Sequence, residues 1–295
     1  MSITESHAYR QLLVNSPINQ TGYEGEPIPT QPPPAKYVAL GDSFSSGEGN
    51  PPFEYETDTD DTNECHRSMS AYPRLLQSVL NLGPTAFVAC SGATTHNVLN
   101  GQWNEPPQVN ALSENTDLVT MTVGGNDVGF ATYATNCAVA TCGPSSAPYG
   151  IVMLAIADPG FKANLIEVYS GVLDRASQAK LFVLGYPRMT PSATATDCTH
   201  TPDANDLGPR DVVDSLNAVI QDAISDVRGS SAEFTDRIDY VEVNSASPPS
   251  PFLDKYICSS NPAFNDVDFG NTEYSYHPNV LGHEAYGELL EDAIG

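Results

Sequence analysis

Short apolar runs alternate with stretches of helical periodicity from residue 36 to the C-terminus. The apolar runs are five or six residues long and predict buried strands at residues 37–41, 86–90, 118–123, 180–184 and 238–243. Between them, apolar residues recur every three or four positions, which predicts helices at residues 71–82, 157–179, 211–227 and 278–294. Gly83-Pro84 ends the first of these helices, and Pro278 is expected in the first turn of the last.

This alternation of strands and helices predicts the fold class. We expect an α/β protein, a three-layer α/β/α sandwich around a five-stranded, mostly parallel, flavodoxin-like sheet. Ligands of such sheets bind beyond the carboxyl ends of the strands. Residues that directly follow the predicted strands are therefore the first candidates for a functional site.

The N-terminal residues have a different composition. Residues 1–35 are polar and carry Pro27, Pro29 and three consecutive prolines at 32–34. Such a sequence cannot form a helix or a central strand and favours a stiff, extended chain. We expect residues 1–35 to be a Pro-rich extension or linker and residues 36–295 to form one domain.

The charge of the chain excludes one class of function. Thirty-seven acidic residues against 12 basic ones give a formal net charge of −25. Such a surface repels nucleic-acid phosphates and anionic lipid headgroups, so we expect no nucleic-acid partner. No run of 18 apolar residues occurs, and we therefore expect no transmembrane segment.

The cysteines point to an oxidising compartment. The chain has six, an even number that fits three disulfides, although its first residues have neither the basic nor the apolar region of a signal peptide. We expect a secreted protein whose leader or upstream domain is absent from this chain. The alternative is a cytosolic protein with six free thiols.

Four polar motifs lie where the fold would bring them together. Ser43 follows the first predicted strand, Gly92 the second and Asn126 the third, and His277 precedes the last helix. Serine becomes a nucleophile when a neutral histidine removes its proton. The backbone N–H groups of Ser43 and Gly92 and the Asn126 amide would stabilise the oxyanion that then forms. Alternatively, Ser43 is only a helix N-cap and Asn126 belongs to an ordinary turn.

These motifs resemble the four blocks of the SGNH (GDSL-type) hydrolase superfamily. The blocks are Gly41-Asp42-Ser43-Phe44, Gly92, Gly124-Gly125-Asn126-Asp127 and His277-Pro278-Asn279, in the same order and at similar spacing. The longer strings around them resemble the secreted actinobacterial esterase and lipase branch. The resemblance covers residues 36 to about 290.

The resemblance implies a role for each motif. Ser43 would be the nucleophile, His277 the base, and Ser43, Gly92 and Asn126 the oxyanion hole. Many members place an aspartate three residues before the histidine, where this chain has Tyr274. We expect the backbone carbonyl of Tyr274 to orient the imidazole. A side-chain acid, Glu273 or Asp268, is the alternative.

The resemblance also suggests sequential disulfides, Cys65–Cys90, Cys137–Cys142 and Cys198–Cys258. Sequence alone allows 15 pairings of six cysteines. Zinc ligation is the competing interpretation, but the chain has no Cys-x-x-Cys pair. The acidic residues at 54–61 do not have the spacing of an EF-hand loop, and we expect a solvated loop there. We expect no metal and no organic cofactor.

The expected function is therefore that of a serine ester hydrolase, similar to carboxylesterases and lipases. Its substrate would be a small-molecule or polysaccharide ester, and the absence of a long apolar lid favours short or soluble acyl groups. The alternative is a non-catalytic glycan- or surface-binding module on the same fold. A flavodoxin-like cofactor domain is disfavoured because no Gly-x-Gly-x-x-Gly follows the first strand. The oligomeric state is not predicted.

Overall fold

The computed structural model describes residues 36–59, 62–137, 142–190 and 208–295. The predicted Pro-rich extension at residues 1–35 lies outside this part, so the extension and its boundary at residue 36 stay predictions. Cys198, a member of the third predicted disulfide, also lies outside the described residues.

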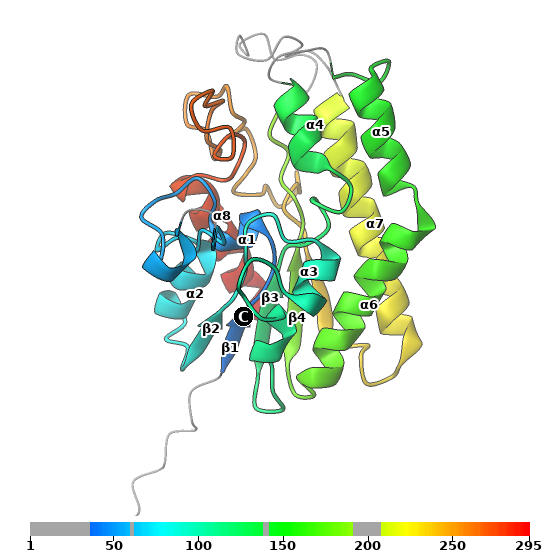
Figure 1. Ribbon diagram of the computed structural model, residues 1–295. Coiled ribbons are helices and arrows are strands. Elements are labelled where there is room, and N and C mark those ends of the chain that lie inside the picture. Colours follow the sequence, from blue (N-terminus) through cyan, green and yellow to red (C-terminus); the bar gives the residue numbers. More distant parts are fainter. Residues whose placement is uncertain (1–35, 60–61, 138–141, 191–207) are drawn as a thin grey trace, which may run out of the picture. The chain divides into compact units, whose positions relative to one another are not determined.

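A five-stranded parallel sheet forms the centre of the molecule (Figure 1), with strand order β2-β1-β3-β4-β5. In register, Val38 of β1 lies between Ala86 of β2 and Val119 of β3. All four strand pairs are parallel, so the predicted α/β class and flavodoxin-like order are confirmed. The strands are β1 (Tyr37–Ala39), β2 (Thr85–Phe87), β3 (Leu118–Met121), β4 (Lys180–Leu184) and β5 (Ile238–Val241).

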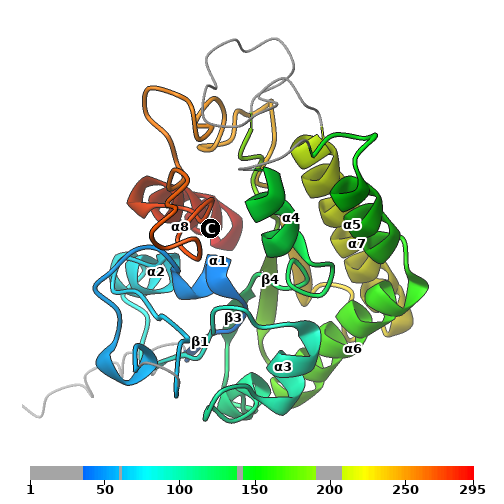
Figure 2. The same ribbon diagram turned by 45° about the horizontal axis from the view of Figure 1, so that its top comes forward.

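Helices cover both faces of this sheet, as Figure 2 shows, with α2 and α8 on one face and α3, α6 and α7 on the other. Helices α4 and α5 extend the second layer by packing on each other and, through α5, on α7. The helices are α1 (Ser43–Ser46), α2 (Tyr72–Val79), α3 (Thr95–Asn100), α4 (Phe130–Cys137), α5 (Ala147–Ile156), α6 (Pro159–Arg175), α7 (Gly208–Ser230) and α8 (Val280–Ile294). Within the described residues, no helix combines the length and the hydropathy needed to cross a bilayer.

Two of the predicted helices begin two residues later than expected, and capping explains both. Helix α8 begins at Val280 because the Asn279 side chain accepts the N–H of Gly282, which leaves Pro278 before the helix. The helix predicted from residue 157 begins at Pro159, where Asp158 is the N-cap. In each case a short polar side chain, and not the apolar periodicity, sets the first turn.

Residues 130–156, which the sequence pattern leaves without an element, contain two helices. Helix α5 begins after Ser146, whose side chain accepts the N–H of Tyr149, and has Pro148 in its first turn. Its residues are almost all apolar, so they show no alternation of apolar and polar faces. Hydrophobic periodicity therefore could not reveal this helix.

His283 of α8 is a packing residue. It is completely buried, and its Nδ1 accepts the N–H of Tyr72 at the start of α2. Burial lowers the pKa of His283 to about 3, so the ring is neutral at physiological pH. This contact joins the two helices that cover the same face of the sheet.

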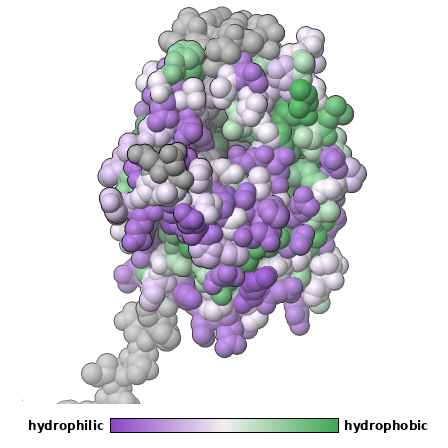
Figure 3. Space-filling view, in the orientation of Figure 1, coloured by the Kyte–Doolittle hydropathy of each residue, from purple (hydrophilic) through white to green (hydrophobic). Residues whose placement is uncertain are grey.

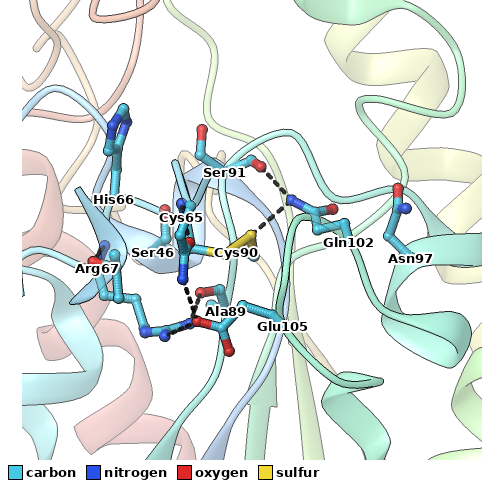
Figure 4. Close-up of a disulfide and its surroundings, with 12 residues drawn as sticks. Ser46, Cys65, His66, Arg67, Ala89, Cys90, Ser91, Asn97, Gln102 and Glu105 are labelled. Carbon is cyan, nitrogen blue, oxygen red and sulfur yellow. Dashed lines mark hydrogen bonds and ion pairs between the residues drawn. A yellow bond between two sulfur atoms is a disulfide. The ribbon is translucent and has the colours of Figure 1, made fainter. Parts of the chain in front are cut away.

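Two of the three predicted disulfides are confirmed, Cys65–Cys90 and Cys137–Cys142. Their four thiols are therefore not zinc ligands. Cys258 is disulfide-bonded as well, but its predicted partner is not described. Figure 4 shows the Cys65–Cys90 bridge, where Gln102 Nε2 donates to the Ser91 carbonyl at 2.7 Å and Arg67 pairs with Glu105 at 2.5 Å. The bridge fixes the loop after α1 to the segment that follows β2.

We expect the double variant C65S/C90S to lose about 3 kcal/mol of unfolding free energy, because the bridge closes a loop between residues 25 apart. Urea denaturation monitored by circular dichroism measures the loss. C137S/C142S is the matched control: its loop spans only five residues, so the entropic loss should be smaller. Equal losses in the two variants would contradict this ranking.

Candidate active site

The Ser43 turn begins the site. Ser43 is the first residue of α1 and follows the end of β1 by only a few residues. The N-cap is Asp42, whose Oδ1 accepts the N–H of Phe44 at 3.0 Å. Ser43 is therefore not the cap, and the side chain of Asp42 stabilises this turn.

Asp42 connects three strand ends. Besides Phe44, its carboxylate accepts the Thr122 hydroxyl at 2.6 Å and the Tyr186 hydroxyl. Tyr186 in turn accepts the N–H of Gly125 at 3.0 Å. Burial raises the pKa of Asp42 to about 6, although these hydrogen bonds lower it. The groups that follow β1, β3 and β4 are thus fixed relative to one another.

Gly41 allows the close approach that this turn requires. Its φ is +124°, and a Cβ there would lie 2.5 Å from the Thr122 carbonyl oxygen. The buried Gln108 side chain accepts the Gly41 N–H at 2.7 Å and donates to its carbonyl at 2.9 Å. This amide pairs with the backbone of Gly41 in the way that a neighbouring strand would.

Gly92 and Asn126 occupy the two neighbouring strand ends. Gly92 has φ +75°, which favours glycine, and a Cβ built there would meet no atom within 4 Å. Backbone conformation and open space, rather than crowding, therefore distinguish this position. The Asn126 amide donates to the Ala93 carbonyl at 3.0 Å, which fixes the Asn126 side chain beside the Gly92 segment.

His277 reaches the site from the segment before α8. Its backbone carbonyl accepts the N–H of Asn265 at 2.9 Å. Asn50, which follows α1, donates through its side chain to the Pro278 carbonyl at 2.7 Å. The side chain of Phe44 packs on the imidazole with ring centroids 5.4 Å apart. The histidine segment is thus joined directly to the Ser43 segment.

A cavity of about 460 Å³ brings the four predicted residues together. Ser43, Gly92, Asn126 and His277 all line it. Much of the remaining wall is apolar or aromatic and includes Phe44, Trp103, Phe130, Ala131, Ala134 and Tyr186. The cavity therefore offers a hydroxyl, an imidazole and hydrogen-bond donors next to a surface that suits a hydrocarbon chain.

Within the described part of the chain, no side-chain acid bonds to the imidazole of His277 through Nδ1. Nδ1 of His277 is buried and has no hydrogen-bond partner within the described residues. Asp268 accepts the N–H groups of Gly270 and Asn271 instead. Backbone groups of the segment 273–275 lie close enough to raise the pKa of His277, although none meets hydrogen-bond geometry with Nδ1.

Glu48 and His66 form a hydrogen-bonded titratable pair in this cavity that the sequence did not indicate. Glu48 is 1% exposed, and its Oε2 accepts a hydrogen bond from His66 Nδ1 at 2.7 Å. Burial raises the pKa of Glu48, but the hydrogen bond from His66 and the charge of His277 hold it below its usual value. Since Glu48 and His66 are 18 residues apart and belong to no shared element, no sequence pattern indicated them.

Two opposing influences set the protonation of His277. Burial lowers the pKa of its imidazole, and the Glu48 carboxylate is the largest influence that raises it. The net pKa lies below the usual value for histidine. A neutral imidazole, able to accept a proton, therefore prevails at neutral pH.

Comparisons with known proteins agree with this arrangement. Residues 39–285 match the GDSL-like Lipase/Acylhydrolase family. Lipase 1 of Streptomyces coelicolor is 33% identical over 247 residues, covering 83% of this chain and 81% of that protein. Two crystal structures superpose well, each with 88% of this chain and 99% of the other covered. One is phospholipase A1 from Streptomyces albidoflavus NA297, with a TM-score of 0.72 and 30% sequence identity. The other is an extracellular lipase from Streptomyces rimosus, with a TM-score of 0.71 and 29% sequence identity.

The family match spans most of the chain, and the sheet and its strand order are those expected of such hydrolases. Relatives named lipase cover more than four fifths of the sequence. This chain belongs to the GDSL-like lipase/acylhydrolase (SGNH) family and is an ester hydrolase of the esterase and lipase type.

Proposed function

We propose that the enzyme hydrolyses carboxylic esters through an acyl-enzyme formed on Ser43, with His277 as the general base. One observation carries the proposal: four residues from separate parts of the chain line the same cavity, and each supplies a group that acyl transfer needs. The neutral state favoured for His277 supports its role as a base.

The reaction runs in two halves. His277 accepts the proton of Ser43 Oγ as the oxygen attacks the ester carbonyl carbon. The Ser43 and Gly92 N–H groups and the Asn126 amide stabilise the oxyanion, and the alcohol leaves with the proton held by His277. Water then attacks the acyl carbon and gives a proton to His277; as the bond between this carbon and Ser43 Oγ breaks, His277 returns the proton to Oγ, and the carboxylic acid leaves.

The Tyr274 carbonyl is our candidate for orienting the imidazole. Backbone groups of residues 273–275 raise the pKa of His277 and the Glu273 and Asp268 side chains do not, which favours a backbone acceptor over either acid. A close packing arrangement holds this carbonyl in place, since a Cβ at Gly49 would lie 3.1 Å from it. The enzyme would then use a Ser43–His277 dyad.

We further propose that the acyl group is a hydrocarbon chain of a lipid ester. Phe44, Phe130 and Ala134 supply apolar surface in the cavity, and relatives are named lipase and phospholipase A1. This differs from the short or soluble acyl groups that the loop composition favoured. The disulfides, together with the relative described as extracellular, support action outside the cell.

We expect Ser43→Ala and His277→Ala each to reduce kcat/KM for p-nitrophenyl butyrate by at least about 10⁴-fold, because the two residues act as a unit. Circular dichroism should show unchanged folding. A fluorophosphonate probe should label parental Ser43 and leave the S43A protein unlabelled. Full activity of S43A would refute the mechanism, and a folded parent without any adduct would favour the non-catalytic binding module.

A series of p-nitrophenyl esters from acetate to palmitate tests the acyl preference. We expect kcat/KM to rise by roughly tenfold or more from acetate to octanoate, since each buried methylene contributes apolar transfer free energy. Acetylated xylan serves as the carbohydrate comparison. A preference for acetate or for xylan would contradict the lipid-ester assignment and leave the serine mechanism intact.

Glu48→Gln tests the electrostatic control of His277. The Glu48 carboxylate raises the pKa of His277, so its removal should lower this pKa and move the acid limb of kcat/KM to lower pH. We also expect kcat to fall roughly three- to tenfold, because the imidazolium formed during acylation loses a nearby negative charge.

Glu64→Gln is the matched control for this variant. Glu64 lines the same cavity, but its carboxylate is not among the groups that shift the pKa of His277. The acid limb of the pH profile of kcat/KM should coincide in the Glu64→Gln variant and the parent. An unmoved limb in the Glu48 variant, or equal shifts in both variants, would refute the assigned influence of Glu48.

A further inference from the structure

A long uncharged segment distinguishes one side of the cavity. Between Asp127 and Asp158, residues 128–157 include no acidic residue, no basic residue and no histidine, whereas 17% of the whole chain is charged. The described part of this segment consists mainly of α4 and α5. In a protein of net charge −25, this is a neutral area of surface next to the active site.

Helix α5 presents an apolar stripe to solvent. The stripe consists of Ala147, Ile151 and Leu154, which lie on one face because they are four and three residues apart. Ile151 is 70% exposed and Leu154 is 75% exposed, while Val152 and Ile156 of the same helix are buried. Figure 3 shows the resulting hydrophobic patch at the upper right, where Figure 1 places α5. Among the described residues, other exposed large hydrophobic side chains do not form such a pair on one helix.

The α5 stripe adjoins the entrance of the cavity through α4. Helix α4 packs on α5, and its residues Ala131, Thr132 and Thr135 both line the cavity and are exposed to solvent. They therefore form part of the cavity rim. The acidic residues of the lining are Asp42, Glu48, Glu64 and Glu273, and all four belong to other segments.

The chemistry of this surface indicates its partner. Exposed aliphatic side chains favour contact with an apolar phase, and the ten-residue α5 is too short to span a bilayer. The net charge of −25 opposes an anionic surface, whereas the uncharged segment carries no charge that contact would desolvate. A protein seated on the stripe and the α4 rim would obstruct the cavity, but a lipid layer there would supply substrate.

We propose that the α5 stripe and the α4 rim dock the enzyme on an electrically neutral lipid surface, from which the ester substrate enters the cavity. This rests on the proposed lipid-ester function. The stripe would lie in the plane of the interface, as amphipathic surface helices do. Lipid contact is separate from the chemical step, so the two are measured separately.

The binding test uses the full chain carrying Ser43→Ala, which prevents hydrolysis of the vesicles. Cosedimentation with phosphatidylcholine vesicles should show binding, and I151D/L154D in the same background should bind at least about tenfold more weakly. Val79→Asp, at an apolar position of α2 that is 59% exposed, is the matched control and should bind like its parent. Vesicles with added phosphatidylglycerol should bind less protein.

The activity test uses the same substitutions with Ser43 intact. The activity of I151D/L154D on phosphatidylcholine vesicles should be at least about tenfold lower than that of the parent. Its kcat/KM for soluble p-nitrophenyl butyrate should stay within about twofold of the parent value. If the aspartates lower the Tm, I151S/L154S replaces them. Leu154→Trp should strengthen binding and report it by a blue shift of its fluorescence.

Several outcomes would overturn the proposal. Vesicle binding equal in parent and I151D/L154D would do so, as would stronger binding to anionic vesicles. A dimeric parent that the double variant converts to monomers without loss of vesicle binding would assign the stripe to a second copy of the chain. A parent inactive on soluble esters as well would instead refute the proposed function.

Discussion

The buried Asp42 carboxylate is the constraint on which the site depends. Its two oxygens accept the Phe44 N–H, the Thr122 hydroxyl and the Tyr186 hydroxyl, which come from α1 and from the ends of β3 and β4. Burial disfavours the charged form of Asp42, and these hydrogen bonds offset part of that cost. A four-residue helix such as α1 has too few hydrogen bonds to be stable alone. The position of Ser43 therefore depends on contacts with the rest of the sheet.

His277 is positioned by a different device. Neutral amide side chains join its segment to distant parts of the chain: Asn50 binds the Pro278 carbonyl, and Asn265 binds the Gly49 carbonyl. Amides can make such bonds without introducing a charge near the imidazole. The charge that does influence His277 comes from Glu48, which is itself paired with His66. Protonation and position of the histidine are thus controlled by separate groups.

The surface around the cavity is electrostatically uneven, and the uneven distribution has a physical use. Carboxylates lie on the segments before α2 and before α8, while the α4 side carries none. A protein of strong negative charge stays soluble and repels other anions. An uncharged rim is the place where such a protein can approach an apolar phase at low desolvation cost.

The sequence by itself determined the features that depend on local chemistry. Five apolar runs predicted the five strands, and the glycine, serine, asparagine and histidine motifs predicted which residues line the cavity. The prediction of the lining residues is correct because the carboxyl ends of parallel strands meet at one edge of a sheet. Periodicity could not reveal α5, because this helix has no polar face. It also could not give the start of α8, because the Asn279 cap places the first helical residue after Pro278.

Only the tertiary structure decided the Glu48–His66 pair, the amide bridge of Gln108, and the absence of an acid at Nδ1 of His277 within the described residues. Each depends on side chains from segments far apart in sequence. Burial and hydrogen bonding between such side chains are properties of the folded chain, and no spacing along the sequence encodes them.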